Sequence, residues 1–228
     1  MKIAIIPARG GSKRIPRKNI KLFHGKPMIA YSIEAAIASG CFDKVIVSTD
    51  DQEIAGVAKM YGAEVPFLRP AEIAGDYATT MDVMAHAIGW CKQQAWNVEA
   101  VCCLYATAPF IFQEDLRQGY TLLQEAGVQF AFSATSFPFP IQRAIKLDEK
   151  GFVSMFSPEY EQARSQDLIE AYHDAGQFYW GQTQAFLTKL SIFSPHSRVV
   201  LLPRNRVQDI DTPEDWAFAE ALYAVLNK

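Results

Sequence analysis

The chain has no long hydrophobic run, no paired cysteines and no strong excess of charge. Its apolar stretches are far shorter than the roughly 18 residues that suggest a membrane helix. The net charge of -3 gives no general attraction for nucleic acid or for a membrane surface. We therefore expect neither a nucleic-acid nor a membrane partner.

The four cysteines show no CxxC pair and no zinc-ligand spacing; they are Cys41, Cys91, Cys102 and Cys103. We expect them to fill the core of a protein in a reducing compartment. The apolar start "MKIAII" is too short for a signal peptide and is soon followed by Arg9, which predicts a cytoplasmic protein.

Two common nucleotide motifs are also missing. The sequence contains neither the P-loop pattern G-x-x-x-x-G-K-[ST] nor the dinucleotide pattern G-x-G-x-x-G. It contains no internal repeat and no low-complexity tract. A P-loop NTPase and a Rossmann dehydrogenase are therefore both disfavoured.

The pattern that is present alternates short apolar runs with segments of helical length. The 228 residues are 50% hydrophobic and 21% charged, as in a globular protein with a sizeable core. We expect strands at 2–7, 44–49, 64–67, 101–105, 130–135, 177–181 and 197–203. We expect helices at 26–40, 51–62, 81–94, 113–127 and 212–226, with Pro27 opening the first helix and Gly40 ending it. This order predicts an α/β fold, a Rossmann-like, mostly parallel sheet with helices on both faces.

The alternation breaks between residues 137 and 174. Period-two stretches surround a "DEKG" turn there, which is typical of an antiparallel hairpin. We expect residues 1–228 to form a single domain, with 137–174 as an insertion that serves as an interface arm or a lid.

The stretch "IIPARGGSKRIPRKN" (5–19) places two glycines and five basic residues directly after the first expected strand. Ligands of open α/β sheets bind beyond the carboxyl ends of the strands, and successive backbone N–H groups there form an anion nest. Arg9 and Lys13 add full charges and Ser12 adds a hydroxyl, so the loop is suited to a polyphosphate. The alternative is a solvated, charged turn, and we regard Arg14, Arg17 and Lys18 as closer to that description.

The acidic stretch "DIDTPEDW" supplies the carboxylates that polyphosphate chemistry requires. In extended backbone Asp209 and Asp211 project to the same side, and Mg²⁺ prefers one or two carboxylates together with waters and phosphate oxygens. The alternative is that Asp211 only precedes the last helix, for which Thr212 is the expected N-cap and Asp215 completes a capping box. Asp50 and Asp51 are a rival acidic pair, which we assign to a loop and a helix start.

These segments resemble the CMP-sugar-acid synthetases, the cytidylyltransferases that activate nine-carbon 2-keto acids. "IIPARGGSKRIPRKN", "GKPMIAYSIEAA", "VIVSTDD", "FLRPAEIAGD" and "DIDTPED" follow the family's order and spacing over essentially the whole chain. The resemblance implies the fold of the nucleotide-diphospho-sugar transferases, CTP as a substrate, Mg²⁺ as the cofactor and a homodimer.

Within the family, "CCLYATAPF", "FAFSATSFPFPIQRA", "SQDL" and "AYHDAGQFYWG" are most similar to members that act on pseudaminic acid. Members that act on sialic acid are expected to have glutamine in place of Tyr105 and "NGA" in place of "AGQ" at 175–177. Legionaminic, sialic or deoxy-octulosonic acid remain alternative substrates. A sugar-1-phosphate nucleotidyltransferase and an inactive nucleotide-binding regulator are more distant alternatives; Lys13 together with Asp209 and Asp211 disfavours an inactive protein.

The resemblance also implies roles for individual residues. Its nucleotide-binding set is Ala8, Arg9, Gly10, Gly11, Ser12, Lys13, Asn19, Arg69, Ala78 and Thr80, with Arg9 and Lys13 catalytic and the last three near cytosine. Its metal ligands are Asp209 and Asp211. Its sugar-binding candidates are Tyr105, Gln142, Arg143, Arg164, His173, Asp174 and Gln177. The insertion matches a dimerisation arm, which would bring Gln142, Arg143 and Arg164 to the partner's site.

Overall fold

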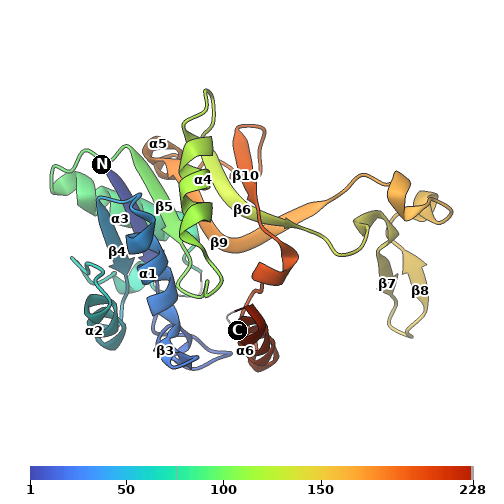
Figure 1. The fold of residues 1–228 in the computed structure, drawn as a ribbon, viewed down its shortest axis with the longest axis horizontal. Helices are drawn as coiled ribbons and strands as arrows, with labels where there is room; N and C mark the ends of the chain where they lie inside the picture. Colours follow the sequence, from blue (N-terminus) through green and yellow to red (C-terminus); the bar gives the residue numbers. More distant parts are fainter. Residues whose placement is uncertain (76, 227–228) are drawn as a thin grey trace.

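A six-stranded mixed sheet forms the centre of the computed structural model, which describes residues 1–75 and 77–226 (Figure 1). The strands lie in the order β10-β6-β9-β5-β1-β4. Their bounds are β1 Lys2–Pro7, β4 Lys44–Ser48, β5 Ala100–Leu104, β6 Phe130–Ser136, β9 Tyr172–Gln182 and β10 Ser197–Leu201. All neighbours run parallel except β9, which is antiparallel to both β5 and β6. The predicted mostly parallel sheet is confirmed.

The strands are buried on both faces, which explains their nearly continuous apolar sequence. In β1, Ala4 and Ile6 contribute to one core cluster, whereas Ile3 and Ile5 contribute to the cluster on the opposite face. The helices are α1 Met28–Ser39, α2 Gln52–Met60, α3 Thr80–Gln93, α4 Gln113–Leu123, α5 Thr183–Leu187 and α6 Pro213–Leu226. Apolar residues of α1, α2 and α4 join the first cluster and those of α3 and α5 join the second.

The last helix covers a third, smaller cluster. Trp216 and Ala219 of α6 pack there with Phe23, Met28 and Tyr31, next to the two-residue strands β2 Leu22–Phe23 and β3 Lys26–Pro27. The predicted cap of α6 is present: Thr212 Oγ1 accepts from the Asp215 N–H at 3.2 Å, and Asp215 accepts from the Thr212 N–H at 2.8 Å. The third cluster therefore holds α6 against Ile15, Phe23, Met28 and Tyr31.

Several predicted details need correction. Gly40 ends α1 in the left-handed conformation (φ 67°), as expected, but Pro27 is the N-cap and not the first helical residue. The strand predicted at 64–67 does not form; only isolated bridges from Glu64 to Ile46 and from Leu68 to Thr49 occur. Pro66 stands inside that segment and has no N–H to donate to a strand ladder.

Residues 137–171 leave the sheet between β6 and β9 and extend away from it as an arm (Figure 1). The predicted hairpin is present in the arm as β7 Ile145–Leu147 and β8 Val153–Met155, which pair antiparallel. Large apolar side chains on the arm are exposed, including Phe139 (78%) and Ile169 (84%). The arm therefore presents apolar surface that the rest of this chain does not cover.

Two further properties bear on the environment of the protein. All four cysteines are free and buried, as predicted. Across the described residues, no helix is both long enough and apolar enough to traverse a bilayer.

Candidate active site

A cavity of about 340 Å³ lies at the carboxyl end of β1 and β5. Seven of the predicted nucleotide residues line it: Arg9, Ser12, Lys13, Asn19, Arg69, Ala78 and Thr80. Tyr105 and Asp211, from the predicted sugar and metal sets, line it as well. The structure thus brings together residues that are up to 202 positions apart, from Arg9 to Asp211.

The glycine loop is fixed by the acidic residues that follow β4. The Gly10 N–H donates to Asp50 Oδ1 at 3.1 Å, so this N–H is used within the chain and does not belong to a nest for a bound phosphate. A Cβ at Gly10 would lie 2.7 Å from Asp51 Oδ2, so the loop needs glycine here for close approach. Gly11 is exposed and has open space around its Cα.

Two further contacts hold the loop in shape. Arg17 has a left-handed backbone (φ 55°), and its guanidinium forms ion pairs with Asp51 and Glu53 of the α2 start. The buried Asn19 donates through Nδ2 to the Arg9 carbonyl at 2.9 Å. Ala8 is also buried, as the direct continuation of β1, and its N–H donates to Ser48. Ala8, Asn19 and Arg17 therefore shape the loop from within the chain.

Arg69 is the most unusual residue of the cavity because its charge is buried. Its exposed fraction is only 6%, and its Nε and one terminal nitrogen have no hydrogen-bond partner. Asp50 is 3.5 Å away, which partly compensates the charge. Burial lowers the pKa of Arg69, and the positive charge of Arg9 lowers it further against the opposing effect of Asp50. A buried unpaired donor is costly, so this guanidinium is suited to an acceptor supplied by a ligand.

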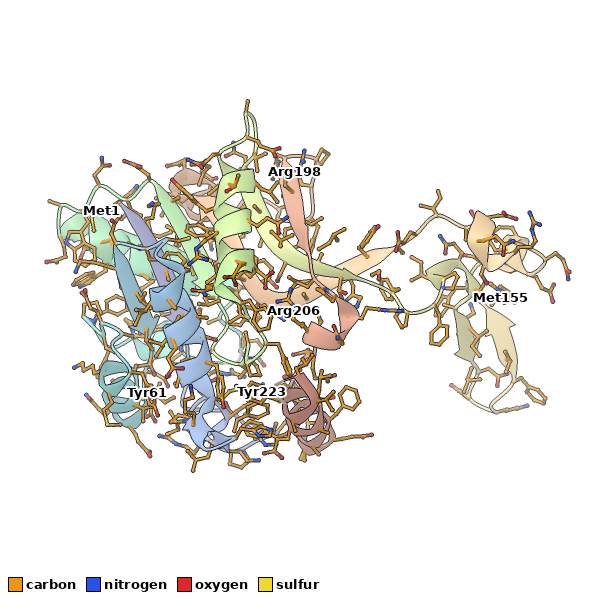
Figure 2. The ribbon with its side chains drawn as sticks, viewed as in Figure 1. Met1, Tyr61, Met155, Arg198, Arg206 and Tyr223 are labelled. Atoms are coloured by element: carbon orange, nitrogen blue, oxygen red, sulfur yellow. The ribbon has the colours of Figure 1, made fainter. Side chains whose placement is uncertain are left out.

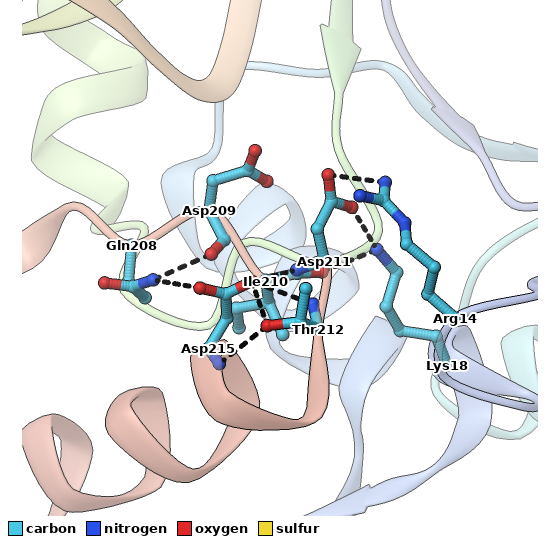
Figure 3. Close-up of polar contacts among 8 residues, drawn as sticks. All are labelled: Arg14, Lys18, Gln208, Asp209, Ile210, Asp211, Thr212 and Asp215. Carbon is cyan, nitrogen blue, oxygen red and sulfur yellow. Dashed lines mark hydrogen bonds and ion pairs between the residues drawn. The ribbon is translucent and has the colours of Figure 1, made fainter. Parts of the chain in front are cut away.

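Asp209 and Asp211 point to the same side of an irregular segment that precedes α6 (Figure 3). Asp211 is held by Arg14 at 2.6 Å and by Lys18 at 3.1 Å. Desolvation opposes ionisation of Asp211, but the hydrogen bond and charge of Lys18, followed by those of Arg14, lower its pKa overall. Partial desolvation and then the charge of Asp211 raise the pKa of Asp209.

The donor set of this segment fits Mg²⁺ better than a closed metal site. In the described part of the chain no group of three or more His, Cys, Asp or Glu residues could hold a metal. Two neighbouring carboxylates beside a cationic cavity leave most ligand positions to waters and phosphate oxygens, which is the usual Mg²⁺ arrangement at nucleotide sites. Desolvation, and after it the negative charge of Asp211, raises the pKa of Asp209, and a divalent cation between the two carboxylates would relieve their repulsion.

The predicted sugar-binding residues divide into groups. Tyr105 and Asp174 line a second, mainly apolar cavity of about 170 Å³, which shares Thr80 and Tyr105 with the first. Burial raises the pKa of Tyr105, whose hydroxyl lies 3.4 Å from Thr80 Oγ1. Asp174 accepts hydrogen bonds from the Tyr179 hydroxyl and from the Gly176 N–H. The remaining lining residues are Met81, Cys103, Tyr179, Phe186, Ile192 and Phe193.

His173 and Gln177 do not line either of these cavities. His173 contacts the Asp174 carbonyl through Nδ1 and packs edge-on against Phe137. Gln177 is 3% exposed and donates to the Arg206 carbonyl at 2.6 Å. The Nε2 group of Gln177 is therefore used inside the fold, whereas its buried Oε1 has no hydrogen-bond partner, and the sugar contact of Gln177 stays a prediction.

Gln142, Arg143 and Arg164 lie on the arm and form local contacts. Gln142 donates to the Ile169 carbonyl at 2.8 Å, Arg143 lies 3.5 Å from Ser165 Oγ, and Arg164 pairs with Asp167 at 2.7 Å. Within one chain, the structure does not bring these three residues to either cavity.

No specific role in the site was assigned from the sequence to three residues that the structure places there, Arg14, Lys18 and Asp50. Lys18 and Arg14 bind Asp211, and Lys18 Nζ also donates to the Ile210 carbonyl at 2.6 Å. Asp50 links Gly10 to Arg69. Asp50 follows the carboxyl end of β4, which is the parallel neighbour of β1, and this topology was the available signal.

Comparison with known proteins agrees with this geometry. The cytidylyltransferase family matches residues 3–223. The chain belongs to this family. It is 52% identical to the pseudaminic acid cytidylyltransferase of Campylobacter jejuni, over 98% of this chain and 96% of that protein. It is 33% identical to the CMP-N,N'-diacetyllegionaminic acid synthase of Legionella pneumophila, over 96% and 95% of the two chains.

A solved cytidylyltransferase also shares the fold. The structure of CMP:2-keto-3-deoxy-manno-octonic acid synthetase complexed with CTP superimposes with a TM-score of 0.73, over 99% of both chains and at 16% identity. The nucleotidyltransferase class of this enzyme is therefore established by the family, and the fold by this likeness.

Proposed function

We propose that this cytidylyltransferase is a CMP-pseudaminic acid synthetase, which converts CTP and pseudaminic acid to CMP-pseudaminic acid and diphosphate. The observation that carries the proposal is the cationic cavity in which Arg9, Lys13 and Arg69 meet Asp211. The similarity to the Campylobacter protein, greater than to the legionaminic acid enzyme, supports the choice of sugar.

In the proposed reaction the anomeric hydroxyl oxygen attacks the α-phosphorus of CTP in line. The bond from the α-phosphorus to the bridging oxygen breaks, diphosphate leaves, and the hydroxyl proton passes to solvent or to a basic group that we do not assign. Lys13 and Arg9 hold the phosphates and stabilise the negative charge that develops on them. Ser12, which lines the cavity, would contribute a hydroxyl donor, the backbone of Gly11 would contribute an N–H, and Arg69 would donate to the cytosine carbonyl oxygen.

Asp209 and Asp211 would hold Mg²⁺, which when bound shields the phosphate oxygens and withdraws charge from the α-phosphorus. For this to happen Asp211 has to exchange its contacts with Arg14 and Lys18. Both cations line the same cavity, so they remain available to the phosphates. Asp211→Ala should retain the fold and lose Mg²⁺-dependent turnover, and unaltered turnover would remove Asp211 from the metal site.

The second cavity is the proposed sugar pocket. Tyr105 and Asp174 supply polar groups at its border with the nucleotide cavity, whereas Phe186, Ile192 and Phe193 supply an apolar wall suited to a methyl-bearing substituent. Arg143 and Arg164 would approach the sugar carboxylate of the partner's site, as the bidentate geometry of arginine favours. This arrangement requires a homodimer formed through the 137–174 arm of a single-domain subunit, which we expect to work in the cytoplasm.

The test is diphosphate release from CTP and Mg²⁺ with purified protein, with pseudaminic, legionaminic and sialic acids compared side by side. We expect release with pseudaminic acid and little with the others. Release with a different acid would retain the nucleotide site and overturn the sugar assignment. Absence of release with every acid, combined with binding of CTP, would favour the regulator instead.

A further inference from the structure

A buried ion pair holds the segment that leads to Asp209 and Asp211. The guanidinium of Arg206 binds both carboxylate oxygens of Asp115 in α4, at 2.7 and 3.1 Å. Both side chains are largely buried, with exposed fractions of 13% and 10%. The same guanidinium lies over the Phe112 ring, 4.3 Å from its centroid. The guanidinium of Arg206 is therefore held in its own plane by the carboxylate and on one face by the aromatic ring.

The backbone of Arg206 is fixed separately from β9. Gln177 donates from Nε2 to the Arg206 carbonyl at 2.6 Å, and Gln177 itself is held at an irregularity where β9 shifts its register against β6. Gly176, with φ 62°, allows this irregularity. Figure 2 shows Arg206 between the sheet and the final helix. α4 and β9 thus both contact Arg206, in the segment that connects β10 to α6.

The other end of the segment is fixed by the cap of α6. Gln208 Nε2 donates to the Asp209 carbonyl at 2.8 Å and lies 3.4 Å from Asp215 Oδ1, which belongs to the capping box with Thr212 (Figure 3). Ile210, which stands between the two aspartates in the sequence, is fully buried in the third core cluster. Asp209 and Asp211 therefore lie on a short span held between Arg206 and the first turn of α6.

We propose that Arg206, with Asp115 and Gln177, is a positioning residue that sets the two carboxylates at the spacing a divalent cation requires. This inference rests on the metal role proposed above for Asp209 and Asp211. A buried ion pair adds little to stability compared with well-packed apolar residues of similar volume. What an apolar pair lacks is the bidentate fork, which fixes the orientation of the segment as well as its distance.

The experiment separates stability from metal binding in the same variant. Replacing both partners, with Asp115→Leu and Arg206→Met, leaves no unpaired buried charge, so we expect a melting temperature close to that of the wild type. Binding of Mn²⁺, measured by electron paramagnetic resonance with and without CTP, should weaken about tenfold, as is typical when residues behind metal ligands are changed. A folded double variant that binds Mn²⁺ within twofold of the wild type would overturn the inference.

A control ion pair is available just beyond the end of α4. Arg198 of β10 pairs with Glu125, which follows α4, at 3.2 Å, and both side chains are exposed. Glu125→Leu with Arg198→Met makes the same two chemical changes and should leave Mn²⁺ binding unaltered. Equal weakening in this control would assign the effect to lost charge and overturn the positioning role.

Gln177→Leu tests the backbone contact alone and decides the question if the double variant fails to fold. We expect it to weaken Mn²⁺ binding several-fold while the ion pair stays in place, and unchanged binding in this folded variant would count against the inference. Asp211→Ala tests the assumption that Asp211 is a metal ligand. If it binds Mn²⁺ as the wild type does, the metal assignment fails and this inference with it. If Asp211→Ala loses Mn²⁺ binding while the double variant and Gln177→Leu keep it, the metal assignment stands and only the positioning role fails.

Discussion

The nucleotide cavity and the arm show opposite relations between polarity and burial. At the cavity a charged side chain, Arg69, is 6% exposed, whereas on the arm Phe139 and Ile169 are 78% and 84% exposed. Neither arrangement is favourable for the isolated chain, because two nitrogens of the buried guanidinium lack hydrogen-bond partners and the apolar surface of the arm faces water. The proposed function supplies a partner for each: a nucleotide for Arg69 and a second subunit for the arm.

The sharpest test of the cavity is Lys13→Ala. Lys13 is exposed, so its removal should leave the melting temperature unchanged. Loss of its charge from the phosphates should lower kcat about 10²- to 10³-fold. The measurement is steady-state diphosphate release, with Lys59→Ala, an exposed lysine on α2, as the matched control. A rate within threefold of the wild type would show that Lys13 does not stabilise the phosphate charge in the reaction.

The arm is tested by placing charge on its apolar surface. Phe139→Asp should yield folded monomers, and turnover should fall at least tenfold because Arg143 and Arg164 no longer reach a partner's site. Sedimentation velocity and turnover should change together. Phe218→Asp, at a 59% exposed position of α6, is the control. A fully active monomer would show that each subunit works without its partner.

Arg69→Gln should produce an intermediate effect that is confined to the nucleotide. We expect KM for CTP to rise about tenfold or more, since a hydrogen bond from a charged group contributes about 1.5–3 kcal/mol. The ligand-free protein should be no less stable, because a buried charge that Asp50 compensates only in part has been removed. Melting curves with and without CTP measure both effects. A loss of stability without ligand would mean that Arg69 serves the fold.

The smallest effect concerns the support of the glycine loop. The hydrogen bond and charge of Arg17, together with backbone N–H groups at the start of α2, hold the pKa of Asp51 at about 2. A depressed folded-state pKa contributes stability above the unfolded value of about 3.9, and this contribution is lost as pH falls towards 2. Asp51→Asn keeps an N-cap acceptor and should cost about 1 kcal/mol at pH 7.

Urea unfolding of the wild type and Asp51→Asn at several pH values measures this contribution. The difference between the two proteins should shrink between about pH 4 and pH 2. A difference that is independent of pH over this window would contradict the role of the ionised carboxylate.

Local chemistry made much of the architecture predictable. The isoleucine-rich β1, the Gly40 stop of α1 and the capping box of α6 are set by nearby residues, and the structure has all three. The site was predictable where it follows a strand end, as with Arg9 and Lys13, or where the family resemblance supplied the position, as with Arg69.

Contacts between distant segments were not predictable in the same way. Lys18 meets Asp211 across 193 positions, and Gln177 meets Arg206 because β9 is displaced by an irregularity at Gly176. No local pattern in either segment encodes its partner. The antiparallel direction of β9 has the same origin, because the length and course of the arm decide from which end the returning strand enters the sheet.

The position of β9 also has a consequence for how the chain folds. β9 lies between β5 and β6, although both precede it in the sequence. Before residues 172–182 have emerged from the ribosome, β5 has one open edge and β6 has two, because β10 follows later still. The places of Phe178 and Trp180 in the core are also empty. Such long-range closure is slow and leaves strand edges exposed to aggregation. We therefore expect a nascent chain that ends before Gln182 to be a chaperone client, and the completed sheet to be one of the last structures formed.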